Sequence, residues 1–136
     1  MLLGRRSVVA CEPVGPYALL RLRRADHDRG EPGQFFMLTP PGRTLPRAFS
    51  LCFAPPGELA FLIDPVGPGT EALAQLGPRD EIDVLGPLGQ GFRLDVARPL
   101  LVGGGIGIAP LVYLSQRLGR PPALLGFRSA AHAEAA

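Results

Sequence analysis

A glycine-rich run between an apolar stretch and a helical pattern carries the strongest chemical signal in the sequence: Gly103-Gly104-Gly105-Ile106-Gly107-Ile108-Ala109-Pro110. Glycines permit positive φ angles and let a ligand approach the backbone closely. A helix that follows such a run offers free N–H groups and the positive end of its dipole, which favour a phosphate group. The run therefore predicts phosphate binding, and a tight turn that merely joins strand and helix is the alternative.

Two further segments carry residue types that suit a phosphorylated ligand. Gly67-Pro68-Gly69-Thr70 precedes a short helical pattern and offers backbone donors and a hydroxyl; ordinary helix capping by Thr70 is the alternative. Arg47-Ala48-Phe49-Ser50 places a guanidinium, whose planar fork can bind a diphosphate, three residues before a hydroxyl. A solvated arginine and a strand serine are the alternative for that segment.

The remaining polar residues give no catalytic constellation. Gly86 to Phe92 marks a shaped loop after a strand and can equally be a linker. His27 lies in a polar turn and His132 in the C-terminal tail, and both are expected to be exposed. The acidic residues of 80–83 surround a strand start and are expected to be solvated. No Ser–His–Asp arrangement and no acid–base pair is predicted.

Composition excludes several classes of protein. All 14 basic residues are arginines, the net charge is +2, and the arginines are scattered except at 21–24, so no nucleic-acid face is predicted. Cys11 and Cys52 lack C-x-x-C spacing and are expected to be small buried hydrophobes. The most apolar stretch, Leu100 to Val112, is shorter than the roughly 18 residues of a membrane span. The N-terminus has no signal-peptide pattern, so a cytoplasmic protein without a membrane partner is expected.

The sequence contains 18 glycines and 16 prolines, and many of them flank short apolar runs. These runs are the predicted strands and helices that must position the segments above. Strands at a spacing of about 8–12 residues are typical of a β-barrel or sandwich. A helix is expected within 67–78, and a strand, a turn and a helix within 100–118, where Pro110 suits the first helical turn. The tail can begin another helix. Strands are expected at 4–12, 17–25, 34–40, 47–54, 59–65, 81–89 and 121–129.

The order of the motifs is more specific than any one of them. Read along the chain they are GQFFM (33–37), RAFSL (47–51), VGPGT (66–70), GPLGQGF (86–92), LVGGGIGIAPL (101–111) and LGFRS (125–129). This order resembles the ferredoxin–NADP reductase superfamily. Within it, the chain is most similar to the electron-transfer subunit of the two-subunit dihydroorotate dehydrogenase. The matching segments span nearly the whole chain.

The resemblance implies a fold and an activity. The fold is a six-stranded antiparallel FAD-binding β-barrel over 1–97, followed by an incomplete α/β nucleotide-binding domain over 98–136. The activity is electron transfer between NADH and a partner dehydrogenase in dihydroorotate oxidation, a part of pyrimidine biosynthesis. The implied partner is the catalytic dihydroorotate dehydrogenase subunit, in a hetero-oligomer. FAD carries the chemistry and the protein positions it, so no side-chain acid or base is required.

The resemblance also assigns roles to residues. Arg47 pairs with the FAD diphosphate, Ser50 lies near the flavin N5 edge, and Gly69 with Thr70 caps the diphosphate. The backbone of 62–64 passes the flavin or its ribityl chain, and the turn 104–110 meets the nicotinamide nucleotide, NADH or NADPH. The full cofactor-binding set is Arg47, Ala48, Phe49, Ser50, Leu62, Ile63, Asp64, Gly69, Thr70, Gly104, Gly105, Ile106, Gly107, Pro110, Arg128 and Ser129, with the last two near the adenosine ribose or phosphate.

The chain departs from the family pattern in two ways. The family's subunit binds a 2Fe–2S cluster through four cysteines near its C-terminus, whereas this chain has only Cys11 and Cys52, both in the barrel half. It also stops after one strand–helix–strand unit, so it is either a fragment of a longer protein or a short member. Two alternatives stay open: another FAD-dependent ferredoxin or NAD(P)H reductase, and a truncated, non-enzymatic docking module for a partner subunit.

Overall fold

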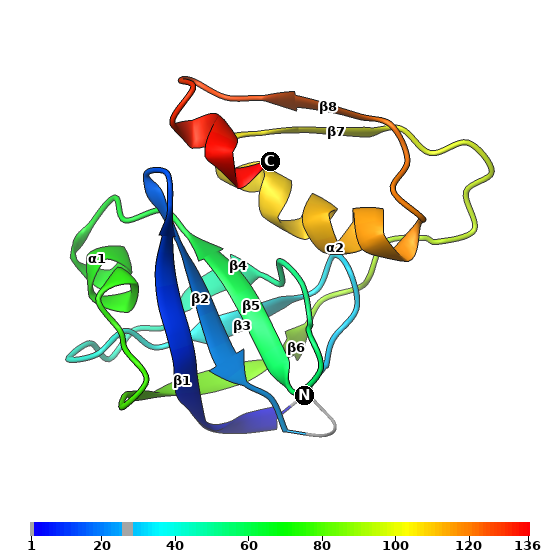
Figure 1. Ribbon diagram of the computed structural model, residues 1–136. Coiled ribbons are helices and arrows are strands. Elements are labelled where there is room, and N and C mark those ends of the chain that lie inside the picture. Colours follow the sequence, from blue (N-terminus) through cyan, green and yellow to red (C-terminus); the bar gives the residue numbers. More distant parts are fainter. Residues whose placement is uncertain (1, 26–28) are drawn as a thin grey trace.

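Six strands form one antiparallel sheet in the computed structural model, which describes residues 2–25 and 29–136, so that His27 lies outside the described residues. The sheet order is β4-β3-β6-β1-β2-β5 (Figure 1). The expected antiparallel six-stranded architecture is confirmed. The strands are β1 (Leu2–Val14), β2 (Tyr17–Arg23), β3 (Phe35–Leu38), β4 (Arg47–Ser50), β5 (Glu58–Ile63) and β6 (Glu81–Leu88).

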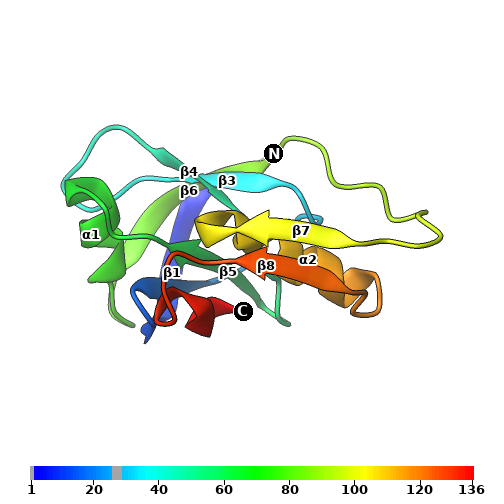
Figure 2. The ribbon, with the colours of Figure 1, turned by 90° about the horizontal axis from the view of Figure 1, so that it is seen from above.

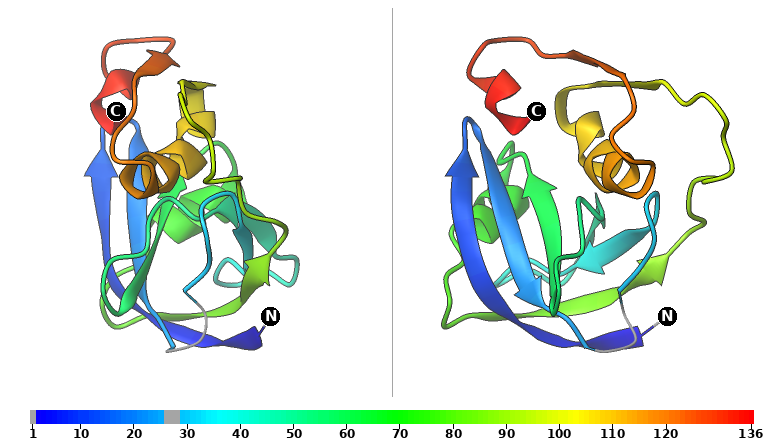
Figure 3. Two further views of the ribbon diagram at one scale, coloured as in Figure 1. Left: turned by 90° about the vertical axis from the view of Figure 1, so that its right-hand side faces the viewer. Right: turned by 45° about the vertical axis from the view of Figure 1, so that its right-hand side comes forward.

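The sheet closes into a barrel just beyond β4. The amide of Cys52 donates to the carbonyl of Ala60 at 2.8 Å, and the amide of Ala60 donates to the carbonyl of Phe53 at 2.9 Å. The segment after β4, at one edge of the sheet, therefore pairs with β5 at the other edge. Figure 3 shows the resulting curvature of the sheet. Strand β4 ends at Ser50, earlier than the expected 47–54. The Leu51 amide still donates to the carbonyl of Gln34 beside β3, and from Cys52 onward the chain pairs with β5 instead.

Side chains from every second strand position fill the barrel, as the two-residue period of a strand requires. Leu20 and Leu22 of β2 are fully buried, and so are Phe36 of β3 and Phe61 of β5. The two phenyl rings meet edge to face, with centroids 5.5 Å apart and planes at 74°, which is a favoured aromatic geometry. Helix α1 (Pro68–Ala74) buries Leu73 in the same core, so the expected short helix packs against the barrel.

A smaller layer follows the barrel. Strands β7 (Leu101–Gly104) and β8 (Ala123–Gly126) pair in parallel, and they are joined by the 3-10 turn η1 (Gly105–Ile108) and helix α2 (Ala109–Arg117). Figures 1 and 2 show α2 between this two-stranded sheet and the barrel. The tail forms only the 3-10 turn η2 (His132–Ala135), not a longer helix.

Only one face of the β7–β8 sheet is covered. Gly103 lies against α2, since a Cβ there would come 2.5 Å from Leu111 Cδ1. On the opposite face Val102 and Leu124, which are register partners, are 67% and 63% exposed. The pair of strands therefore has an apolar face that no described residue buries.

Helix α2 is fastened to the barrel along its length. Ile108 and Ala109, at its start, are buried in one cluster with Tyr17 of β2. Tyr113 is 3% exposed and belongs to the barrel core, and its hydroxyl donates to the carbonyl of Gly30 at 3.4 Å. Near the helix end Arg117 pairs with Glu31. The two parts of the chain are thus held in one relative position. No helix among the described residues has the length and apolarity to cross a membrane.

The turn between β1 and β2 touches the C-terminal segment, and this contact gives a first prediction. Gly15 has a φ of 57°, and a Cβ there would overlap the carbonyl oxygen of Ala131. Gly57, in another turn, has a φ of 75° but open space around it. We expect Gly57→Ala to cost about 1 kcal/mol of unfolding free energy from backbone strain alone. Gly15→Ala should cost at least about 1 kcal/mol more, because η2 must also move.

Urea unfolding measures both costs, and trypsin cleavage after Arg128 reports the C-terminal segment directly. Faster cleavage is expected in Gly15→Ala and not in Gly57→Ala. Equal cleavage rates in the two variants would contradict the contact.

Candidate cofactor-binding site

The Arg47 side chain lies against the start of α1. A Cβ placed on Gly69 would come 3.2 Å from Arg47 Nη2 and 3.4 Å from Nε, so the absence of a side chain on Gly69 lets the guanidinium approach the helix backbone. Arg47 Nη1 donates to the carbonyl of Leu45 at 3.0 Å, and Arg47 forms no ion pair with a carboxylate in the part of the chain that the structure describes. A cation without an anionic partner therefore stands beside backbone donors.

Thr70 shapes those donors. Its Oγ1 accepts from the amides of Val66 and Gly67, both at 3.0 Å, and lies 3.1 Å from the carbonyl of Gly67. The Glu71 amide already donates to the Gly67 carbonyl. The amides of Gly69 and Thr70 are then the first-turn donors without an intrahelical acceptor. The sequence predicts Thr70 at the site, and the structure shows that its hydroxyl closes the turn while its amide remains at the helix start.

A hollow of about 320 Å³ gathers three segments that are far apart in the sequence. Strand β4 contributes Ala48, Phe49 and Ser50, and the end of β5 contributes Leu62 and Asp64. The glycine-rich turn and the start of α2 supply the opposite wall with Ile106, Gly107, Ala109 and Pro110. Eight of these nine residues belong to the set predicted from the sequence. Ala109 is absent from that residue set, although it lies within the turn 104–110 that was predicted to meet the nicotinamide nucleotide.

Some predicted residues lie outside this hollow. The Ile63 side chain is fully buried in the barrel core, so only its backbone can meet a ligand. Gly104 ends β7 and Gly105 has a φ of 55° at the start of η1, beside the hollow in the chain but not in its lining. Arg128 and Ser129 follow β8 and line neither this hollow nor the larger one described next.

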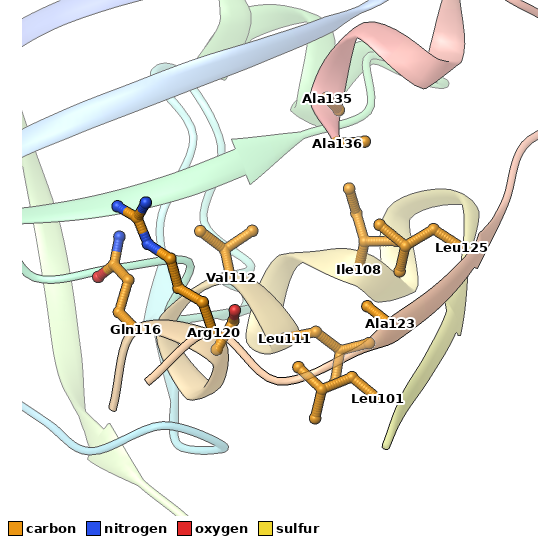
Figure 4. A pocket seen from close by; sticks show the side chains of 11 residues that line it. Leu101, Ile108, Leu111, Val112, Gln116, Arg120, Ala123, Leu125, Ala135 and Ala136 are labelled. Atoms are coloured by element: carbon orange, nitrogen blue, oxygen red, sulfur yellow. The ribbon is translucent and has the colours of Figure 1, made fainter. Parts of the chain in front are cut away.

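The larger hollow, of about 510 Å³, is a different kind of surface. It lies between the β7–β8 sheet, α2 and the C-terminal turn (Figure 4), and leucine and alanine side chains form most of its lining. Gln116 and Arg120 stand together at one side of it, and Ala135 with Ala136 at the other. It contains none of the predicted cofactor-binding residues, so size alone does not identify the site.

His132 corrects an expectation. It was predicted to be exposed, but it is buried, with 9% of its surface accessible. Its ring meets Tyr17 edge to face at 5.4 Å, and its two nitrogens contact Ser129 Oγ at 2.6 Å and Arg128 Nε at 3.0 Å. The sequence could not show this because the contact joins the tail to β2, more than 100 residues away.

The two cysteines lie in different parts of the barrel. Cys52 is buried at 3% exposure, and burial raises the pKa of its thiol to about 12. Cys11 is half-buried, with Sγ near the carbonyls of Leu73 and Ala74, and desolvation followed by the charge of Glu12 raises its pKa as well. Among the described residues no group of three or more His, Cys, Asp and Glu side chains is placed to hold a metal ion.

These shifts predict the thiol chemistry of the folded protein. The thiolate is the reactive form, and a raised pKa lowers its population at any pH below that value. At pH 8 we therefore expect iodoacetamide to alkylate Cys11 more slowly than free cysteine and to leave Cys52 unmodified until urea unfolds the chain. Mass spectrometry of time points measures both sites. Alkylation of native Cys52 at the rate of Cys11 would contradict its burial.

Comparison with known proteins relates the chain to a family, although no protein-family model matches it. Over 88 residues it is 40% identical to the electron transfer subunit of dihydroorotate dehydrogenase B (NAD(+)) from Clostridium perfringens, covering 63% of this chain and 36% of that subunit. Over 103 residues it is 45% identical to the probable electron transfer subunit of the same enzyme from Methanopyrus kandleri, covering 75% and 38%. The chain is similar in sequence to these electron-transfer subunits. It spans less than half the length of the subunits it matches.

Solved structures agree with this similarity at the level of the fold. An NADH-dependent reduced ferredoxin–NADP oxidoreductase superimposes with a TM-score of 0.83 at 24% identity, over 93% of this chain and 50% of that one. A ferredoxin NADP+ reductase from Neisseria gonorrhoeae gives 0.74 at 19% identity, over 96% and 59%. The expected architecture, a six-stranded antiparallel barrel followed by part of an α/β layer, is thereby confirmed at the level of the fold.

Proposed function

We propose that this chain binds FAD and passes electrons between NADH and a partner dehydrogenase that oxidises dihydroorotate. One observation carries the proposal: the Arg47 guanidinium meets the start of α1 next to a hollow shared by β4, the end of β5 and the glycine-rich turn. The names of the relatives, electron transfer subunits of dihydroorotate dehydrogenase B (NAD(+)), support the same function.

The diphosphate of FAD fits the group around Gly69. Arg47 supplies a positive charge and several N–H donors, and the first-turn amides of Gly69 and Thr70 lie at the helix start that its guanidinium approaches. Charge-assisted hydrogen bonds of this kind are about twice as strong as neutral ones. A Cβ on Gly69 would lie 3.2 Å from Arg47 Nη2, a tight contact, so the missing side chain supports the close approach of the guanidinium.

The flavin ring fits the hollow. Phe49, Leu62 and Ile106 would give the ring apolar walls, and the Ser50 hydroxyl would offer it a hydrogen bond. When bound, FAD supplies hydride acceptance and stepwise electron release. The chain's own residues would hold the ring between β4, the end of β5 and the glycine-rich turn.

The nicotinamide nucleotide is assigned to the second layer. In the proposal, residues 1–97 form the flavin domain and 98–136 the first part of the nucleotide domain, with the turn 104–110 facing the nicotinamide. Arg128 and Ser129 meet the adenosine ribose or phosphate. Support for this assignment comes from Ile106, Gly107 and Pro110, which share the hollow with β4.

The partner is proposed to be the catalytic dihydroorotate dehydrogenase subunit.

A 2Fe–2S cluster does not fit the residues present, because Cys11 and Cys52 are two thiols, not four, and each packs into a separate part of the barrel. No electron step through such a cluster is assigned to this chain. A cytoplasmic location stays a prediction.

The test begins with flavin uptake. Purified protein stripped of cofactor should take up FAD in a 1:1 ratio, observed as quenching or a shift of flavin fluorescence, and anaerobic NADH should then bleach the flavin absorbance. Protein that remains colourless with added FAD would overturn the proposal. FAD uptake with no bleaching by NADH or NADPH would retain the flavin site and reject the nucleotide assignment.

The alternatives give different outcomes in the same experiment. Bleaching by NADPH in preference to NADH would favour another reductase of the superfamily. A partner subunit that co-purifies with flavin-free protein would favour the docking module.

A further inference from the structure

The cluster of Arg128, Ser129 and His132 lies outside both hollows, and its hydrogen bonds determine where protons sit. Arg128 Nε is 3.0 Å from His132 Nε2. Because an arginine Nε–H can only donate, Nε2 must be an acceptor and carries no proton. A neutral imidazole then has its proton on Nδ1, which donates to Ser129 Oγ at 2.6 Å.

This arrangement leaves two groups free to donate. Ser129 Oγ accepts two hydrogen bonds, one from Nδ1–H of His132 and one from the His132 amide at 3.4 Å. Both of its acceptor sites are therefore used, and its own O–H is available to donate. Arg128 is held through Nε, and its terminal NH₂ groups form no hydrogen bond with the residues that the structure describes. Both Arg128 and Ser129 are exposed. A ligand that meets them must therefore present acceptors, as a ribose hydroxyl or a phosphate oxygen does.

We propose that His132 is a positioning residue for nucleotide binding: it holds Arg128 and Ser129 in place as donors toward the adenosine ribose or phosphate. The inference rests on the proposed function, which assigns these two residues to the nucleotide, and it adds a residue to that site. His132 itself does not touch the ligand, since both of its ring nitrogens are occupied by Arg128 and Ser129.

His132 is in turn fixed from the barrel. The Tyr17 ring of β2 packs on the imidazole edge to face, with centroids 5.4 Å apart at 76°. Gly15, in the turn before β2, lies so close to the carbonyl oxygen of Ala131 that a Cβ on Gly15 would overlap that oxygen. A continuous set of contacts thus runs from the flavin domain through His132 to the donors of the second layer.

Three substitutions separate the two hydrogen bonds. His132→Asn keeps an N–H donor near the Nδ1 position and loses the acceptor for Arg128. His132→Gln reaches the Nε2 position with an amide oxygen that accepts from Arg128, and it loses the bond to Ser129. His132→Phe retains a ring against Tyr17 and loses both bonds.

The probe is ADP-ribose, added to the FAD-loaded full chain and measured by calorimetry. His132→Phe is expected to raise its Kd about tenfold, and Asn and Gln to recover part of the loss. In an Arg128→Ala background, Gln and Phe should bind equally, because the bond that distinguishes them is gone. Wild-type affinity in His132→Phe, or an unchanged difference between Gln and Phe without Arg128, would overturn the inference.

A second readout does not depend on the ligand. The ¹⁵N NMR spectrum of the imidazole should show a protonated Nδ1 and an unprotonated Nε2 at neutral pH, and the reverse tautomer would overturn the inference. If wild-type protein binds FAD but not ADP-ribose, the nucleotide part of the proposed function fails together with this inference. Binding by wild type with unchanged affinity in His132→Phe rejects the inference alone.

Discussion

Replacing Arg47 with alanine is expected to weaken FAD binding about 100-fold. Hydrogen bonds to charged groups are worth about 1.5–3 kcal/mol each, and tenfold in affinity corresponds to about 1.4 kcal/mol. Arg47 lies against Gly69 with no carboxylate partner among the described residues, so its loss removes charge from the proposed diphosphate site without breaking an ion pair. A fluorescence titration with FAD measures the change.

Arg43→Ala is the matched control, because Arg43 is an exposed arginine in the loop that leads into β4. It removes the same charge four residues away and should change the FAD affinity less than threefold. If both variants lose affinity equally, net charge and not the Arg47 position would explain the effect. Unfolding curves of the two variants should coincide, since neither side chain is part of the barrel core.

Phe61→Ala is expected to cost about 3–5 kcal/mol of unfolding free energy, the usual range for deleting a buried aromatic side chain. Phe61 is fully buried and forms the edge-to-face pair with Phe36 in the centre of the barrel. Domains of this size have about 5–15 kcal/mol of stability in all. The variant should therefore unfold at much lower urea concentration and lose bound FAD as it does so.

The exposed Leu3 provides the comparison for Phe61. It lies on β1, is 75% exposed, and its replacement by alanine should change the free energy by no more than about 0.5 kcal/mol. A loss of less than about 1 kcal/mol in Phe61→Ala would show that the barrel centre relaxes around the cavity, and that the aromatic pair does not organise the core.

The strands were predictable because glycine and proline mark their ends and apolar residues alternate between them. What local sequence could not show is the crossing after β4. Leu51 and Cys52 continue the apolar pattern of the strand, yet the Cys52 amide leaves the β3 side and donates to Ala60, which closes the barrel. For the same reason β8 is shorter than the expected 121–129, since only Ala123–Gly126 finds a partner strand.

The site was predictable as a set of segments and less so as a set of atoms. Ser50, Asp64 and Gly107, from three distant motifs, do line one hollow. The use of the Thr70 hydroxyl within its own turn and the burial of His132 depend on neighbours that the sequence does not name. Thr70 and His132 both carry hydrogen-bonding side chains, and tertiary contacts determine the partners of such side chains more than the local sequence pattern does.

The two-stranded sheet has a consequence for the behaviour of the protein in solution. Within the described structure, β7 and β8 each have one edge whose backbone groups pair with no other strand, and neither strand contains a charged residue or a proline. Such residues are what natural sheets commonly place on an edge to prevent another chain from adding to it. With Val102 and Leu124 exposed beside those edges, self-association at high concentration is expected to begin in this layer.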